Sequence, residues 1–495
     1  MVGPKNVLLL IADDLGRDIS TYNPQSPAKT PHLTALAQTG TRFTYGFTST
    51  ASCSPSRTVI YTGLHTHTNG NYGLSDGWNA FCTFSHVDTA PKIFRSLGYL
   101  TGIIGKVHVG PPELYPWQVR DESESRDVAW VADRAESFIA QAQRWEKPFF
   151  LTVGYIDPHR NMAERAGFGN RDFGYDPRIK DKRYTAGEVL VPNYLSDLPG
   201  VRTELAEYCR SINRLDQGVG LILDKLRQRG VADNTLVIFL SDNGPPFVNS
   251  KTTLYDAGVH LPLIIRQPGS SPGVVNPNLV SWVDILPTML DWAGHPALNT
   301  PNASRRRGRS LLPIMSKSQR LDAWCKVYGS HTFHEISNFW PTRFLRNERF
   351  KYHRNVAWKL DFPFAADLYA SLSWDGIRNS AAKHGGTAMV GPRKLKDYIR
   401  RPPEELYDLD ADPAEVHNLA KDPEYADVVR EMRADLERWQ ADTGDPFLWR
   451  DGISVLLMKP YVRDEGLRVP DRWDFDVDAP GNIEGKMLKF EKSKL

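Results

Sequence analysis

The sequence has few cysteines, almost no excess of charge and no long hydrophobic run. Its four cysteines, at 53, 82, 209 and 325, are widely spaced, so neither a disulfide framework nor a zinc site is expected. The 61 basic and 59 acidic residues leave a net charge of +2, which gives no reason to expect a nucleic acid or a membrane as partner. No apolar run approaches the roughly 20 residues of a transmembrane helix.

The beginning of the sequence leads at once into an apolar stretch that starts at Val7. This leaves no room for a signal peptide, so we expect a cytoplasmic protein. If the sequence is a piece of a longer precursor, we expect a lysosomal or secreted protein instead.

The length of 495 residues exceeds the roughly 250–300 residues at which a single core stops growing. Two domains are therefore expected. From about Phe344 the sequence changes to short aromatic and charged runs, and an apolar stripe with helical spacing follows between 428 and 439. We predict a catalytic domain over 1–343 and a smaller α+β domain over 344–495, with an antiparallel sheet and a C-terminal helix.

Short β-rich apolar runs in the first domain each end in a polar group. They cover residues 7–12, 101–104, 149–155 and 236–240. Helical patterns alternate with them over 30–39, 132–145 and 205–230. The alternation predicts an α/β fold with a large, mixed, mostly parallel sheet sandwiched by helices. Because ligands bind at the carboxyl ends of such strands, the polar groups should gather at one edge.

Two of these polar groups supply only oxygen donors. Asp13 and Asp14 follow the first run, and Asp242 and Asn243 follow the last. Paired acids after a strand can also be helix caps or solvated turn residues. Their arrival from two strand ends favours a site for a hard cation, Ca²⁺ or Mg²⁺, over a zinc site.

The other strand ends carry cations and imidazoles. Lys106 and His108 share one side of an extended segment, where a lysine can hold an oxyanion and a histidine can accept a proton. His159 is suited to protonate a leaving group, and its neighbour Arg160 to bind an anionic or hydroxylated substrate. Lys251 is a second candidate cation, and an exposed loop lysine is the alternative reading of that position.

The run CSPSR at 53–57 predicts the beginning of a helix. Pro55 fits the first turn and Gly63 fits the C-terminal end. Unpaired N–H groups and the helix dipole favour an anion beside Cys53, and Arg57 lies one turn further on. A buried structural cysteine is the alternative for an isolated residue, but the whole run predicts a pocket for an oxyanion of the sulfate or phosphate type.

Cys-x-Pro-Ser-Arg followed by Thr-Gly resembles the motif of the type I sulfatases, members of the alkaline-phosphatase-like superfamily, in which the cysteine is oxidised to formylglycine. Further segments occur in the order expected of that family: ADD at 12–14, GIIGKVHVGP at 102–111, DPHR at 157–160 and SDNG at 241–244. The segments HTNGNYGL at 67–74 and YGSHTFHE at 328–335 are similar to the sulfamidase branch. Position 251 is lysine where that branch favours arginine.

The resemblance implies an alkaline-phosphatase-like fold and a sulfohydrolase that cleaves the sulfamate of N-sulfoglucosamine or a heparan-type sugar. It implies one Ca²⁺ ion held by Asp13, Asp14, Asp242, Asn243 and the formylglycine derived from Cys53. The residues around the nucleophile and sulfate would be Arg57, Lys106, His108, His159 and Lys251. The residues in contact with the sugar would be Asp157, Arg160, His334 and Glu335. Expected partners are a sulfated sugar or small molecule, the formylglycine-generating machinery, and a second copy of the chain in a homodimer.

Other functions remain open at this point. The same core would serve an O-sulfatase acting on a sugar, a small alcohol or an aryl sulfate. A phosphonate or phosphodiester hydrolase of the same superfamily is a second alternative, because the pocket selects a tetrahedral oxyanion. A non-catalytic glycan-binding protein is a third, in which Cys53 would stay unmodified.

Overall fold

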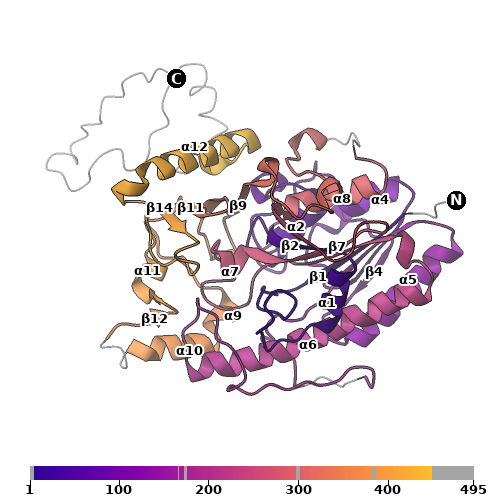
Figure 1. Cartoon of the computed structure of the whole chain (residues 1–495), viewed down its shortest axis with the longest axis horizontal. Helices are drawn as coiled ribbons and strands as arrows, with labels where there is room; N and C mark the ends of the chain where they lie inside the picture. The colour runs from indigo at the N-terminus through magenta and orange to yellow at the C-terminus, as the bar shows by residue number, and fades with distance from the viewer. Residues whose placement is uncertain (1–4, 166, 172–175, 297–301, 382–385, 449–495) are drawn as a thin grey trace.

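The computed structural model describes residues 5–165, 167–171, 176–296, 302–381 and 386–448. It contains a large mixed sheet between two layers of helices and a smaller antiparallel sheet (Figure 1). Among the described residues, no helix is both long and apolar enough to cross a membrane. The predicted fold class is confirmed.

The large sheet has eight short strands, and all but the edge strand β4 are mostly buried. Their order across the sheet is β4 (Val119–Glu122), β3 (Leu100–Gly105), β5 (Phe149–Gly154), β1 (Asn6–Ala12), β6 (Thr235–Ser241), β7 (His260–Arg266), β2 (Thr41–Phe47) and β8 (Val274–Ser281). Only β7 is antiparallel to its neighbours. In the parallel register of β1 and β6, Ala12 lies opposite Ser241. The residues after these two strands therefore emerge side by side.

Alternate side chains of β1 explain why helices cover both faces of this sheet. Leu8 and Leu10 pack in the same cluster as residues of three helices, α1 (Pro31–Gln38), α5 (Val128–Arg144) and α6 (Pro199–Gln228). Val7, Leu9 and Ile11 pack on the opposite face with α2 (Cys53–Thr62), α4 (Ala90–Ser96) and α8 (Ile285–Trp292). A strand buried on both faces reads as a continuous apolar run, which is why β1 could be predicted.

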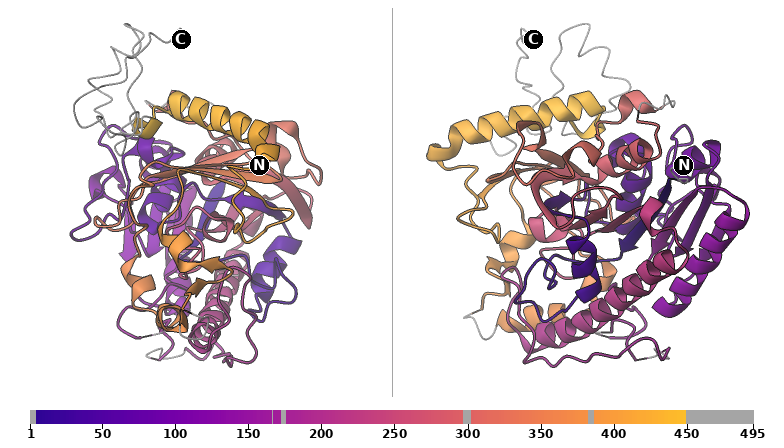
Figure 2. Two further views of the ribbon diagram at one scale, coloured as in Figure 1. Left: turned by 90° about the vertical axis from the view of Figure 1, so that its left-hand side faces the viewer. Right: turned by 45° about the vertical axis from the view of Figure 1, so that its right-hand side comes forward.

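The smaller sheet is antiparallel and has four strands. Their order is β14 (Glu404–Asp408), β11 (Phe350–Asn355), β10 (Thr342–Arg346) and β9 (Val327–His331). Helix α12 (Ala426–Thr443) lies along this sheet (Figure 2). Its residues Val429, Met432, Leu436 and Trp439 are buried against Leu345, Tyr352 and Leu406 of the strands. The predicted C-terminal helix is thus present, with its apolar stripe on the sheet.

Between β11 and β14 the chain returns to helix α6, which covers one face of the large sheet. This segment contains α9 (Ala366–Tyr369), α10 (Leu372–Asn379), β12 (Met389–Val390), β13 (Arg393–Lys394) and α11 (Leu395–Ile399). Trp374 and Ile377 of α10 join the same core cluster as α6. Two short helices complete the set, α3 (Thr66–Asn69) and α7 (Asp256–Val259).

The domain boundary expected after residue 343 lies inside β10, and the antiparallel sheet begins earlier, at Val327. The aromatic and charged runs that suggested the boundary are the later strands of that sheet. Residues 449–495 of the expected second domain lie outside the described residues.

Candidate active site

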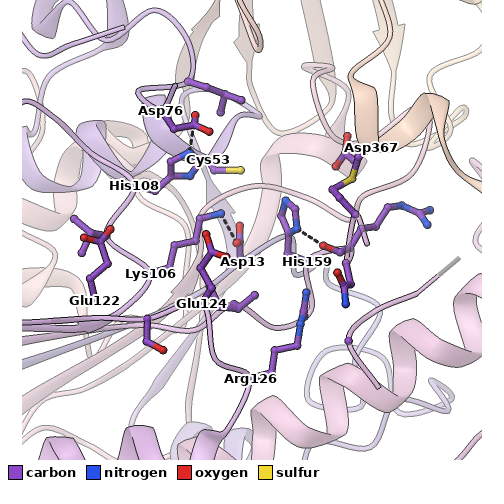
Figure 3. A pocket seen from close by; sticks show the side chains of 18 of the residues that line it. Asp13, Cys53, Asp76, Lys106, His108, Glu122, Glu124, Arg126, His159 and Asp367 are labelled. Carbon is purple, nitrogen blue, oxygen red and sulfur yellow. Dashed lines mark hydrogen bonds and ion pairs between the residues drawn. The ribbon is translucent and has the colours of Figure 1, made fainter. Parts of the chain in front are cut away.

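A cavity of about 1130 Å³ opens where β1, β3 and β5 end (Figure 3). Asp13 directly follows β1, Lys106 follows β3, and the segment after β5 carries His159. The polar groups expected at one sheet edge therefore do come together. The sequence-predicted residues that line the cavity are Asp13, Cys53, Lys106, His108, His159, Arg160, Lys251, His334 and Glu335.

Cys53 is the first residue of α2, as the sequence predicts. Ser52 before it is extended, with φ −149° and ψ 136°, and Gly63 closes the helix in the left-handed conformation, with φ 64°. A glycine tolerates this conformation without steric cost. The Cys53 side chain is only 1% exposed, and burial raises the pKa of its thiol well above the usual value, although Lys106 and Lys251 oppose this. The unmodified thiol is therefore protonated at neutral pH and is a poor nucleophile.

Five residues form a buried layer that we call the strand-end floor: Asp13, Asp14, Cys53, Asp242 and Asn243. The Asp14 backbone N–H donates to Asp242 Oδ1 over 3.1 Å, and Asn243 Nδ2 donates to Asp14 Oδ1 over 2.7 Å. Asp13 Oδ1 and Asn243 Oδ1 are buried and have no hydrogen-bond partner among the described residues. Ligand atoms of Asp13, Cys53 and Asp242 all lie within 4.8 Å of one another.

The floor concentrates negative charge where water is excluded. Burial raises the pKa of Asp14 to about 6 and that of Asp242 to about 7. Burial would also raise the pKa of Asp13, but nearby cations, led by Lys106, hold it well below its usual value. Crowded carboxylates with unpartnered oxygen atoms are the donor set that a hard divalent cation prefers. The residues present therefore fit the implied Ca²⁺ ion.

Two cations of the predicted set already have carboxylate partners in the floor. Arg57 Nε donates to Asp242 Oδ2 over 2.9 Å, and Lys106 Nζ donates to Asp13 Oδ2 over 2.5 Å. Burial alone would lower the pKa of the Lys106 ammonium, but the surrounding acidic groups, led by Asp13, together raise it. Both cations are held in place before any anion arrives, which limits the reorganisation required when one binds.

Lys251 is buried, with 1% of its surface exposed, and is not the exposed loop lysine considered above. Its Nζ donates to Asp14 Oδ2 over 3.0 Å and to Asp367 Oδ2 over 2.8 Å, and it lies 3.1 Å from His159 Nε2. The Nδ1 atom of His159 lies 2.6 Å from the Arg160 carbonyl oxygen. Since a carbonyl only accepts, Nδ1 carries the proton and Nε2 accepts from Lys251. Burial, reinforced by Lys251, lowers the pKa of His159 to about 3.

His108 lies at the mouth of the cavity in a left-handed backbone conformation, with φ 51°. Its Nε2 is 3.3 Å from Asp76 Oδ1 (Figure 3). Burial, with help from Lys106, lowers the pKa of His108 to about 4. The imidazole is therefore neutral at pH 7 and can accept a proton.

A second group, which we call the loop wall, lies beyond the large sheet: His334 and Glu335 follow β9, and Asp367 lies in the short helix α9. His334 Nδ1 lies 2.8 Å from Ser52 Oγ, and Ser52 directly precedes Cys53. Glu335 Oε1 accepts the backbone N–H of Ala366 over 3.2 Å, which joins the segment after β9 to the start of α9. All three residues line the cavity. The loop wall thus faces the part of a ligand that projects away from the floor.

Asp157 does not occupy the position that the resemblance implies. Its Oδ1 accepts hydrogen bonds from Arg126 NH1, Ser211 Oγ and Arg214 NH2, and its Oδ2 accepts from Arg214 Nε. The side chain is 1% exposed and is not among the residues that line the cavity. Because four donors already use the carboxylate, we correct the expected sugar contact and assign Asp157 to the support of the loop after β5.

The Arg160 guanidinium is also fixed by protein groups. It makes a bidentate pair with Glu204 of α6, at 2.7 and 2.9 Å, and its Nε donates to the Pro246 carbonyl. The same Glu204 carboxylate accepts the backbone N–H groups of Leu372 and Ser373 at the start of α10. Arg160 therefore borders the cavity while its guanidinium pairs with Glu204 behind it, and its contact with a substrate stays a prediction.

Several cavity residues lacked any sequence signal. Asp76, which contacts His108, lies in a loop, and Asp367, which contacts Lys251, lies in the four-residue helix α9; neither belongs to a motif. Arg126 lies just before α5 and reaches Asp157. No periodicity or spacing marks these positions, and only the alternating polar residues SESR at 123–126 hint at an exposed rim.

Comparison with known proteins gives this geometry a context. The family described as Sulfatase matches residues 5–295. A human N-sulphoglucosamine sulphohydrolase is 37% identical over 481 residues, covering 93% of this chain and 95% of the relative. A structure determined in complex with its substrate D-glucosamine-2-N,6-O-disulfate superposes with a TM-score of 0.64, at 20% identity, over 89% of this chain and 98% of that one. The phosphonate monoester hydrolase of Agrobacterium radiobacter superposes with a TM-score of 0.60, at 20% identity, over 89% and 96% of the two chains.

The two solved structures show that the fold is shared. The family match and the human relative also show which family the chain belongs to. The family match spans both strand ends that build the floor and the whole of α2. The relative extends the likeness through the smaller sheet, since it covers 93% of the chain. The chain belongs to the sulfatase family of hydrolases.

Proposed function

We propose that this sulfatase hydrolyses the N-sulfate of a glucosamine residue and releases sulfate and the free amine. The observation that carries the proposal is the placement of Cys53 between the carboxylates of the floor and the ammonium groups of Lys106 and Lys251. This arrangement fits a tetrahedral anion beside the helix N-terminus. The human relative that shares 37% of its residues with this chain supports the choice of substrate.

We propose that one Ca²⁺ ion is bound by the floor residues Asp13, Asp14, Asp242 and Asn243, together with residue 53. The unpartnered oxygen atoms Asp13 Oδ1 and Asn243 Oδ1 support this donor set. When bound, the ion supplies positive charge against the oxygen atoms of the reacting group.

We further propose that the formylglycine-generating machinery converts Cys53 to formylglycine. The raised pKa of the buried thiol supports this, because an unmodified cysteine here has little thiolate to offer. The modified residue supplies an oxygen nucleophile.

The remaining residues act on the sulfuryl group and on protons. Lys106 and Lys251 neutralise charge on the sulfuryl oxygen atoms, and Arg57 holds Asp242 in place from behind. His108 is neutral and accepts a proton at the mouth of the cavity. His159 delivers the proton to the leaving nitrogen after taking it up when the anionic substrate binds, because the Lys251 ammonium, 3.1 Å away, has a pKa raised well above its usual value and keeps its own proton.

The test is a set of parallel assays with glucosamine 2-N-sulfate, an aryl sulfate and an aryl phosphodiester, combined with mass spectrometry of the peptide that contains residue 53. We expect the highest kcat/KM for the N-sulfate and a mass that corresponds to aldehyde or its hydrate in place of thiol. Preference for the aryl sulfate or the phosphodiester would replace the proposal by an O-sulfatase or a phosphodiester hydrolase. Sugar binding without cleavage, with an intact thiol, would indicate a glycan-binding protein.

A further inference from the structure

Asp367 presents one carboxylate oxygen that is bound and one that is free. Oδ2 accepts the Lys251 ammonium over 2.8 Å. Oδ1 is buried and has no hydrogen-bond partner within the described part of the chain. The residue is 7% exposed and lines the cavity. A buried acceptor without a donor is costly, so this oxygen is suited to a donor that a ligand brings.

The charge of Asp367 limits what that donor can be. Burial alone would raise the pKa of this carboxyl, but Lys251, His159 and His334 together outweigh burial and lower it, so the group is ionised at neutral pH. An ionised carboxylate can only accept hydrogen bonds. It would repel the oxygen atoms of a sulfuryl group, which are themselves anionic. Its free oxygen therefore has to face the leaving group, on the other side of the bond that breaks.

The position of Asp367 places it close to that bond. Lys251 Nζ joins Asp367 to His159, and the ligand atoms of His159, Asp14 and Cys53 all lie within 4.8 Å of one another. In Figure 3 the Cys53 side chain points toward the side of the cavity that carries His159 and Asp367. Lys251 thus links the reacting position beside Cys53 to the free oxygen atom of Asp367.

A sulfamate and a sulfate ester differ in the donors that they place there. The bridging nitrogen of a sulfamate carries one hydrogen, whereas the bridging oxygen of an ester carries none. We propose that Asp367 Oδ1 accepts the N–H of the sulfamate and thereby selects N-sulfated over O-sulfated sugars. This inference rests on the proposed function and adds the residue that determines the choice of leaving group.

The overall reaction fits an acidic group on this side. Water adds an oxygen to sulfur, the S–N bond breaks, and the nitrogen gains the protons that make it an ammonium: R–NH–SO₃⁻ + H₂O gives R–NH₃⁺ + SO₄²⁻. The nitrogen carries an N–H donor in the substrate and is an ammonium in the product. A carboxylate that accepts a hydrogen bond from the sulfamate N–H also attracts the product ammonium.

Asp367 could instead act only by positioning Lys251, and the experiment separates the two roles. Glucosamine 2-N-sulfate and glucose 2-O-sulfate differ only in the bridging group. We expect Asp367→Ala and Asp367→Leu to lower kcat/KM for the N-sulfate relative to the O-sulfate by about 10–100-fold, because a site built for a donor loses its discrimination when the acceptor is removed. Any effect that acts through Lys251 should lower kcat/KM for both substrates by the same factor. Asp361→Asn, an exposed acid close in sequence, is the matched control and should leave the ratio unchanged.

An equal loss on both substrates would overturn the inference and leave the proposed function standing. A wild-type enzyme inactive on the N-sulfate would overturn both. If thermal unfolding shows that the Asp367 variants are not folded, a crystal structure of Cys53→Ala with glucosamine 2-N-sulfate tests the inference instead. We expect the nitrogen within about 3.2 Å of Asp367 Oδ1, and a nitrogen that contacts other groups would overturn the inference.

Discussion

The strand-end floor and the loop wall meet in one cavity but are built in opposite ways. Floor residues follow β1 and β6 or begin α2, and their carboxylates pair with one another's donors or with Arg57, Lys106 and Lys251, leaving two free oxygen atoms that suit a metal ion. Loop-wall residues come from the segment after β9 and from the short helix α9, and Asp367 leaves an acceptor free beside the cavity. Oxygen atoms that meet in one buried layer are fixed for a single ion, whereas a free group in the wall is available to a variable ligand. The comparison suggests that the floor carries the chemistry and the loop wall selects the substrate.

The largest expected effect comes from removing the reactive side chain of the floor. Cys53→Ala should lower kcat at least about 10⁴-fold on every substrate, because no group remains to attack sulfur. Sulfate release from N- and O-sulfated sugars measures this loss. The matched control is Cys325→Ser at an exposed cysteine, which should retain full activity. An active Cys53→Ala enzyme would contradict the role of the floor.

Removal of the proposed ion comes next. Chelation by EGTA, or the substitution Asp242→Asn, should lower kcat/KM about 100–1,000-fold, to the same extent for N- and O-sulfates, because both use the floor. Added Ca²⁺ should also raise the Tm of the wild-type protein, since a ligand stabilises the state that binds it. EGTA already saturated with Ca²⁺ is the control. Unequal losses of kcat/KM on the two substrates would show that the floor also takes part in substrate selection.

A change in the loop wall should be smaller and selective. His334→Ala removes a ring that lies 2.8 Å from Ser52 Oγ and borders the sugar side of the cavity. We expect kcat/KM for the N-sulfated sugar to fall about tenfold through loss of orientation, with less effect on a compact aryl sulfate. His417→Gln, at an imidazole with 82% of its side chain exposed, is the control. An equal loss of kcat/KM on both substrates would show that His334 contributes to the chemistry, as the floor does, and not to substrate selection.

The smallest effect on catalysis is expected from a histidine that belongs to neither group. Burial lowers the pKa of His67 to about 4 from 6.5, and its Nε2 lies 2.9 Å from Thr443 Oγ1 at the end of α12. Between these pH values the unfolded chain binds more protons than the folded one, so the folded state loses stability as the pH falls. The loss amounts to about 3 kcal/mol by pH 4.

His67→Gln should therefore flatten the fall of Tm between pH 6.5 and 4 and leave kcat/KM at pH 7 within about twofold of wild type. Thermal unfolding across this pH range makes the comparison. An unchanged pH dependence of Tm would show that the proton uptake lies elsewhere, and a large loss of activity would tie this histidine to the cavity.

The floor residues could be predicted from the sequence because strand geometry determines their positions. The apolar run of β1 is buried on both faces, and the parallel register that sets Ala12 opposite Ser241 brings the acids after both strands together. The limits of α2 followed from Pro55 and Gly63. These positions depend on local pattern and on one general rule of parallel sheets.

The strands β2 and β4 were not predicted. Helix-flanked β4 reads VRDE, with no apolar run, because it is an edge strand. The sequence of β2, TRFTYGF, contains an irregularity between Phe43 and Gly46 that breaks its alternation. Edge and irregular strands carry a weaker pattern than buried ones.

The loop wall and the support of the cavity were harder to predict. Asp367 meets Lys251 across 116 positions of the sequence, and the partner of Arg160 is a glutamate inside a helix of 30 residues. Nothing local at Arg160 distinguishes a charge that is neutralised from one that is free to bind substrate. Such pairings are decided by packing between segments, which a single sequence does not display.

Glu204 gives the two sides of the cavity a common anchor. One carboxylate fixes Arg160, next to His159, and also the first residues of α10, a few positions after Asp367. Any substitution at this helix position would loosen the proton donor and the selecting acid together. Efforts to retarget the enzyme to other leaving groups should therefore leave residue 204 untouched and vary the loops that it holds.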